Sequence, residues 1–177
     1  MIYPMEKDIL IFTLSQQLCA LPLSVIERIV RVVEIHPLPK APEVVLGLIN
    51  VHGRAIPVLD VRKLFRLPSP EMALSDQIII AHTSGRIVGL LVDNTEGVHE
   101  YREEDVVTSE ELFPGIEYLE GVVKLKAGVR EKSQTFWSSG GIVYIYDLDR
   151  FLSLEEKAVI DRLLPPGSTM PEVGWHD

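Results

Sequence analysis

The sequence predicts a mainly β fold made of two small, similar β-units. Short runs rich in Ile, Val and Leu recur along the 177 residues and are broken by Gly, Pro, Asn and Ser. Strands this short and this regularly spaced are typical of small barrels or a sandwich. Helical patterns are few, and elements of the first half recur in the same order in the second, which indicates an internal duplication.

The apolar runs predict the individual elements in order along the chain. We expect strands over residues 9–14, 18–23, 28–34, 46–51, 55–59, 77–82, 87–92, 98–101, 122–126 and 142–146. A helix is predicted over 154–164, because Ser153 and Glu156 have the spacing of a capping box and Pro165-Pro166 cannot continue it. Residues 165–177 are expected to form a mobile tail.

The repeat is clearest where AIPVLDVRKLF, at 55–65, aligns with IVYIYDLDRFL, at 142–152. Each segment is an apolar strand followed by Asp and a short charged helix start. The repeat predicts one subdomain over about 8–67 and another over about 76–152, joined by the connector LPSP. The second copy carries a longer polar, Gly-rich loop at 127–141, which we expect to be mobile.

Composition and charge narrow the function classes. The net charge of -9 argues against nucleic-acid binding, which needs a basic surface. The apolar runs are too short to cross a bilayer, so direct membrane insertion is not expected. No signal-peptide pattern opens the chain, and the single Cys19 reads as a buried apolar residue. These features predict a cytoplasmic protein.

The chemistry-bearing residues form no recognisable catalytic or metal motif. Asp60 and Asp147 occupy equivalent positions in the repeat and suggest an aspartic dyad, but Val61 and Leu148 follow them where such sites need small residues. We therefore expect both aspartates to cap the helices that follow. No His pairs with another His or Cys at a ligand spacing, and no phosphate-binding loop is present. The sequence predicts no enzyme, no metal and no cofactor.

Two interpretations of the remaining features stay open on the residues alone. His52-Gly53-Arg54 lies between two strands and reads as a simple hairpin turn, or as a turn that presents Asn50, His52 and Arg54 to a partner. The loop at 127–141, with Phe136 and Trp137, could instead be the lid of a small-ligand-binding regulatory barrel over a closed apolar pocket.

Several segments resemble the CheW-like adaptor family. The central stretch LPKAPEVVLGLINVHGRAIPVLDVRKLF is similar to the family's signature, and GLLVDNTEGVHEY, YLEGVVKL and IVYIYDLDRFLS resemble its second half in the correct order. The resemblance covers about residues 8–164. It implies two five-stranded SH3-like β-barrels with pseudo-twofold symmetry, which agrees with the independent repeat.

The resemblance also implies a role and partners. CheW-like proteins are non-enzymatic couplers that join the cytoplasmic tip of a chemoreceptor to the regulatory domain of a CheA-type histidine kinase, within membrane-associated arrays. The implied receptor-binding residues are Ile26, Ile29, Val30, Asn50, His52, Gly53, Arg54 and Val98. For the kinase we expect exposed strand positions at Val122, Lys124, Val143 and Tyr144.

This sequence departs from the family pattern at three places. His52 stands where the family usually has Arg before the turn Gly, and Arg54 follows two positions later. Thr95 replaces an apolar residue, and the loop at 127–141 is enlarged. These departures leave open a chemosensory-like system with pili or another output.

Overall fold

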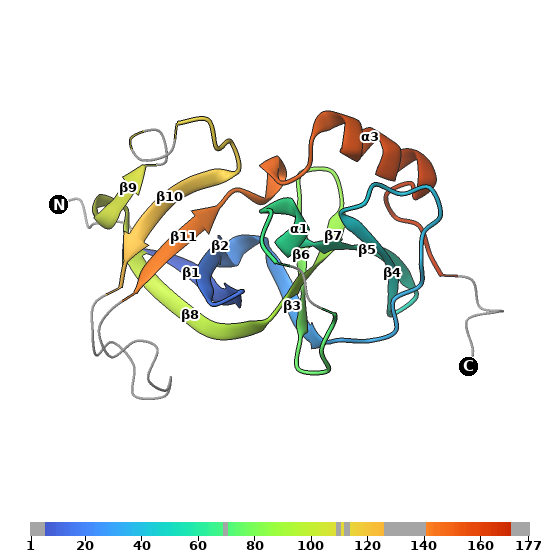
Figure 1. The fold of residues 1–177 in the computed structure, drawn as a ribbon, viewed down its shortest axis with the longest axis horizontal. Coiled ribbons are helices and arrows are strands. Elements are labelled where there is room, and N and C mark those ends of the chain that lie inside the picture. Colours follow the sequence, from blue (N-terminus) through green and yellow to red (C-terminus); the bar gives the residue numbers. More distant parts are fainter. Residues whose placement is uncertain (1–5, 69–70, 109–110, 112–113, 126–140, 171–177) are drawn as a thin grey trace. The chain divides into compact units, whose positions relative to one another are not determined.

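The computed structural model describes residues 6–68, 71–108, 111, 114–125 and 141–170. The chain forms two compact units, of which unit 1 comprises Met1–Val25 and Asp93–Phe151 and unit 2 comprises Ile26–Val92 and Leu152–Asp177. Each unit is built on one β-sheet, so the predicted mainly β class is confirmed (Figure 1). None of the described helices is long and apolar enough to span a bilayer.

Unit 1 contains a sheet of six strands in the order β8-β1-β2-β11-β10-β9 (Figure 1). Its strands are β1 (Glu6–Leu14), β2 (Gln17–Pro22), β8 (Asn94–Arg102), β9 (Val106–Thr108), β10 (Leu119–Lys124) and β11 (Ile142–Tyr146). The core lies on one face of this sheet, where alternating side chains meet. It includes Ile9, Ile11, Leu18, Ala20, Val123, Val143 and Ile145.

Unit 2 contains a sheet of five strands in the order β3-β6-β7-β5-β4. Its strands are β3 (Ile26–Arg31), β4 (Val45–Val51), β5 (Arg54–Asp60), β6 (Gln77–His82) and β7 (Ile87–Val92). The core again gathers aliphatic side chains from alternate positions. Its buried members are Ile49, Val51, Ile56, Val58, Ile78, Ile80 and Leu91.

The helical segments are short and follow strands. They are η1 (Leu23–Val25), α1 (Val61–Leu64), η2 (Glu103–Asp105), η3 (Leu148–Arg150) and α3 (Leu154–Leu163). The predicted capping box at the start of α3 is confirmed. The Ser153 hydroxyl accepts from the Glu156 N–H at 3.1 Å, and the Glu156 carboxylate accepts from the Ser153 N–H at 3.1 Å.

The internal repeat has a direct structural counterpart. β5 pairs in parallel with β7, and its equivalent β11 pairs in parallel with β2. The strands before them, β4 and β10, each contain a register shift that ends at Gly47 or Gly121. A Cβ added at Gly47 would lie 2.2 Å from the His36 carbonyl oxygen, and one added at Gly121 would lie 2.5 Å from Val106 Cγ1. A side chain at either position would therefore collide with the segment that approaches it.

The two compact units are not the two contiguous halves, 8–67 and 76–152, that the repeat predicts. Unit 1 takes the β1–β2 hairpin from the first half and β8 to β11 from the second. Unit 2 takes β3, β4 and β5 from the first half and the β6–β7 hairpin from the second. The division differs because β8 pairs with β1, and β3 with β6, so that each half gives its first hairpin to the other unit.

Two further expectations need correction. One sheet has six strands instead of five, because residues after η2 add the short strand β9 at its edge. The predicted mobile tail, 165–177, begins with an ordered segment, since Thr169 forms a β-bridge with Arg54 and Met170 is 7% exposed. The expected loop at 127–141 falls almost entirely outside the described residues, as does the rest of the tail from 171.

Candidate protein-binding surfaces

The turn between β4 and β5 is a tight hairpin with exposed polar residues. Val51 pairs with Arg54, so His52 and Gly53 are the two central residues of the turn. Both have positive φ, 51° and 84°, as a type I′ turn requires. The Gly53 N–H donates to Asn50 Oδ1 at 2.8 Å, which ties the turn to the end of β4. The side chains of Asn50 and His52 are left facing solvent.

Two charged residues of β3 hold this turn in place. Arg54 donates from Nη1 and Nη2 to the two carboxylate oxygens of Glu27, at 3.1 and 2.9 Å, a geometry that fixes the orientation of both groups. Arg28 Nη1 lies 2.9 Å from His52 Nε2. Because Arg can only donate, His52 Nε2 is the acceptor in this contact.

The Glu27–Arg54 pair also shifts the ionisation of both partners. The hydrogen bond from Arg54 is the main cause that lowers the pKa of Glu27, against the opposing effect of partial burial. The same bond raises the pKa of Arg54. Both groups therefore stay charged throughout the neutral range.

The apolar residues that the family resemblance implies for receptor binding differ in how exposed they are. Ile29 on β3 is 38% exposed and is free to contact another protein. Ile26 is half-buried, and Val30 is half-buried and packs against the core of unit 2, so Val30 contributes to the fold of that unit. Val98 is half-buried on β8 opposite Leu10 and belongs to unit 1.

Unit 1 carries a row of accessible residues across its last three strands, which we call the outer row. Val122 of β10 lies opposite Val107 of β9 and opposite Tyr144 of β11. Lys124 of β10 lies opposite Ile142 of β11. Val107 is 41% exposed, Ile142 is 56% exposed and Lys124 is exposed. Directly opposite residues on one face of a sheet contact each other, so the row is a continuous surface of apolar and charged side chains.

The expected exposure of Val143 is wrong. Its side chain is 0% exposed and packs in the core of unit 1. Side chains alternate between the two faces of a strand, so Val143 points inward where Ile142 and Tyr144 point outward. Val143 therefore cannot contact a partner without disruption of the core.

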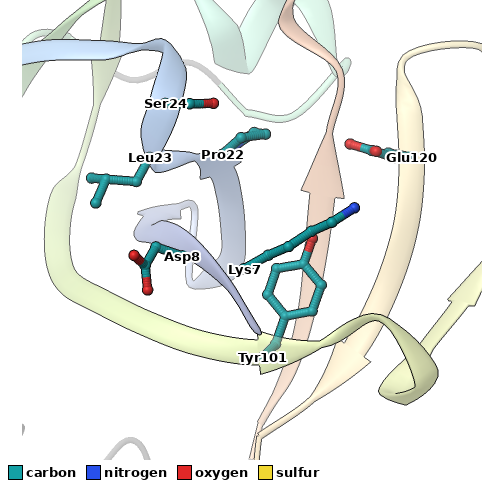
Figure 2. Close-up of a pocket in the computed structure, with 7 residues that line it drawn as sticks. All are labelled: Lys7, Asp8, Pro22, Leu23, Ser24, Tyr101 and Glu120. Carbon is teal, nitrogen blue, oxygen red and sulfur yellow. The ribbon is translucent and has the colours of Figure 1, made fainter. Parts of the chain in front are cut away.

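Unit 1 also has an open depression on its surface. It has a volume of about 570 Å³ and is lined by Lys7, Asp8, Pro22, Leu23, Ser24, Tyr101 and Glu120 (Figure 2). The Lys7 side chain extends in the direction of Glu120 (Figure 2). The ion pair with Glu103, at 3.4 Å, raises the pKa of Lys7. The depression is open and carries the charged residues Lys7, Asp8 and Glu120, so it differs from the closed apolar pocket that a ligand-binding barrel predicts.

Comparison with known proteins identifies the family. A family model described as the CheW-like domain matches residues 8–156.

The chain belongs to the CheW-like family.

Relatives of this CheW-like chain are named chemotaxis protein CheW. Chemotaxis protein CheW of Thermotoga maritima is 36% identical over 93 residues, which cover 52% of this chain and 61% of that protein. Chemotaxis protein CheW of Treponema pallidum is 27% identical over 125 residues, which cover 67% and 74%. The crystal structure of the scaffolding protein TtCheW from Thermoanaerobacter tengcongensis superposes with a TM-score of 0.71 at 25% identity, over 86% of this chain and 96% of that one.

The two aspartates of this CheW-like chain are helix caps. Asp60 Oδ1 accepts from the Lys63 N–H at 3.3 Å, and Asp147 Oδ1 accepts from the Asp149 N–H at 3.0 Å. The cap interpretation is confirmed for both aspartates. Burial raises the pKa of the Cys19 thiol to about 12, which leaves it protonated and unreactive.

Sequence reasoning missed the residues of the CheW-like domain that hold the turn. Glu27 and Arg28 were absent from the predicted site, although adjacent opposite charges in the short strand IERIVR were a usable signal. Among the described residues, no group of three or more His, Cys, Asp or Glu side chains is placed to hold a metal ion.

Proposed function

We propose that this CheW-like chain is an adaptor without catalytic activity that couples chemoreceptors to the regulatory domain of a CheA-type histidine kinase in the cytoplasm. The family match over residues 8–156 carries this proposal. Relatives named chemotaxis protein CheW and a solved relative described as a scaffolding protein support it.

The β4–β5 turn is the proposed receptor contact. It is exposed, and it is held by the Glu27–Arg54 pair and by the contact between Arg28 and His52. A turn that is already fixed loses little conformational entropy when a partner binds, which favours affinity. Ile29, at 38% exposure on β3, supplies apolar area for an amphipathic receptor helix. Ile26 is a further candidate for this contact, and Val98, on β8 of unit 1, is a separate candidate for receptor binding.

The outer row of unit 1 is the proposed kinase contact. Val122, Lys124 and Tyr144 belong to it, and the exposed Val107 and Ile142 extend it. Such a combination of aliphatic, aromatic and cationic side chains is typical of a protein interface with an apolar centre and a charged rim.

Binding measurements with two matched variants test the proposal. The wild-type chain is titrated separately with CheA-type regulatory domains and with chemoreceptor tip fragments encoded in the same genome. We expect Val122→Asp to weaken kinase binding at least tenfold and to leave receptor binding unchanged, because a carboxylate then replaces the apolar side chain between Val107 and Tyr144 in the outer row. We expect His52→Ala to weaken only receptor binding. The kinase that binds also identifies the output of the pathway.

Thermal unfolding of both variants serves as the control for folding. A wild-type chain that binds none of these kinases contradicts the coupling function. Equal losses for both partners with either variant contradict the assignment of two separate surfaces.

A further inference from the structure

The chain segment after α3 pairs with the first residues of β5, beside the β4–β5 turn, on the side of β5 that faces away from β4. Thr169 forms an antiparallel bridge with Arg54. The Ala55 N–H donates to the Ser168 carbonyl oxygen at 3.0 Å, and the Met170 N–H donates to the Gly53 carbonyl oxygen at 2.7 Å. We call Ser168, Thr169 and Met170 the C-terminal clamp.

The clamp is anchored by packing as well as by these hydrogen bonds. Met170 is 7% exposed and lies in an apolar cluster with Leu48, Ala55 and Leu164. A side chain buried to this degree loses several favourable contacts if the segment detaches. The cluster includes residues of β4 and β5, the two strands that the turn connects.

Arg86 secures α3, which precedes the clamp. Its Nη1 donates to Asp161 Oδ1 at 3.1 Å, and its Nη2 donates to the Leu164 carbonyl oxygen at 2.7 Å. The second bond satisfies a carbonyl at the end of the helix, where no backbone partner follows. The chain therefore enters the clamp from a fixed point on unit 2.

The clamp and β3 contact different atoms of the turn. β3 acts on side chains, through Glu27 with Arg54 and Arg28 with His52. The clamp acts on the backbone, at the Gly53 carbonyl and the Ala55 N–H. Since these two hydrogen bonds flank the Arg54–Thr169 pair, the two residues face each other as a closely spaced, non-hydrogen-bonded pair. The exposed Thr169 thus extends the surface beside Arg54.

We propose that the C-terminal clamp is a positioning element for receptor binding: it fixes the backbone of the β4–β5 turn in the conformation that the receptor recognises. This inference rests on the proposed function for the identity of the partner. The apparent affinity of a site falls in proportion to the fraction of molecules in the binding-competent conformation. If loss of the clamp leaves the turn ordered in a tenth of the molecules, the Kd for the receptor rises about tenfold.

Two shortened chains test the inference in the absence of any partner. One ends at Gly167 and lacks the clamp, and the matched control ends at Pro171 and keeps it. Hydrogen exchange is measured at the Ala55 amide, which the clamp protects, and at the Ile80 amide in the interior strand β6. We expect exchange at Ala55 to accelerate at least about tenfold in the shorter chain only, with Ile80 unchanged, because local opening affects only the amides that it releases.

The same chains are then titrated with a chemoreceptor tip fragment and with a CheA-type regulatory domain. We expect the Kd for the receptor to rise about tenfold in the chain that ends at Gly167 and to stay unchanged in the chain that ends at Pro171. Kinase binding should be unchanged in both, because the outer row lies in unit 1. The full-length Met170→Ala variant keeps the clamp backbone and loses only the anchoring side chain. It should also accelerate exchange at Ala55 and raise the Kd for the receptor.

Three results overturn the inference or its basis, and they can be distinguished. Equal exchange at Ala55 in both shortened chains shows that the clamp does not hold the turn. Faster exchange with unchanged receptor affinity shows that the turn needs no positioning, which overturns the inference alone. A wild-type chain that binds the kinase and no receptor fragment overturns the receptor half of the proposed function, and the role of the clamp with it.

Discussion

The Glu27→Gln substitution tests how strongly the charged pair on β3 holds the β4–β5 turn. Glutamine keeps the shape of the side chain and removes its charge, so one of the two hydrogen bonds from Arg54 then goes to an uncharged acceptor and the other is lost. The side chains of Arg54 and Glu27 are 35% and 25% exposed, so water screens part of the interaction. We therefore expect a loss of about 1 kcal/mol in the free energy of unfolding at neutral pH.

The pH dependence of this loss follows from the pKa of Glu27. Because the hydrogen bond with Arg54 lowers the pKa of Glu27 in the folded chain below 4.5, the stabilisation is fully present above that value. It is lost as the pH falls through the lower folded-state pKa, where Glu27 takes up a proton. Arg54 stays ionised over this range and adds no pH dependence of its own.

Thermal unfolding of wild type and Glu27→Gln over a series of pH values measures the effect. A loss of about 1 kcal/mol corresponds to a Tm lower by about 2–4 °C for a chain of this length. The exposed Glu43 on the same unit supplies the control, and Glu43→Gln should leave the Tm unchanged. Equal Tm values for wild type and Glu27→Gln at neutral pH, or a difference that persists undiminished in acid, would refute the reasoning.

Three further predictions concern stability and binding. Asp76→Ala removes the carboxylate 3.4 Å from the buried Arg62 guanidinium and should cost about 3–5 kcal/mol in denaturant unfolding, whereas Arg62→Met with Asp76→Leu should cost much less. Gly47→Ala places a Cβ 2.2 Å from the carbonyl oxygen of His36 and should lower the unfolding free energy by about 2–5 kcal/mol; a fully stable variant contradicts the close approach. Ile29→Asp should weaken receptor binding in titration calorimetry without a change in Tm, and unchanged binding removes Ile29 from the contact.

The sequence predicted most strands because their pattern is local. Gln77–His82, Ile87–Val92 and Ile142–Tyr146 have the predicted bounds, since each is an apolar run with turn residues on both sides. The three-residue strand Val106–Thr108 was missed, because it is too short to show a period and depends on its pairing with β10. β1 begins at Glu6, three residues before the predicted start, because pairing with β8 extends it through charged residues.

Non-local pairing was beyond the reach of the sequence. The repeat shows which elements are equivalent, but it does not show which copy of a hairpin pairs with which copy of β8 or β3. The same limit applies to the binding surfaces. The turn at His52 and Gly53 was predicted from its residue types, whereas the clamp at Met170 lies outside any strand pattern and depends on backbone groups at the start of β5 that β7 does not pair. Strict alternation along β11 does predict that Val143 lies on the face opposite to Ile142 and Tyr144, as the structure shows.

The exchange of hairpins between the two halves of the chain constrains how the protein is made. The β1–β2 hairpin leaves the ribosome early, but its neighbour β11 ends only at Tyr146, so its sheet cannot close until most of the chain has been synthesised. During that interval the early hairpin exposes apolar residues such as Ile9 and Ile11. The same exchange means that cleavage between β5 and β6 would yield two fragments that each lack strands of both sheets, so the two surfaces could not be separated into independent working pieces.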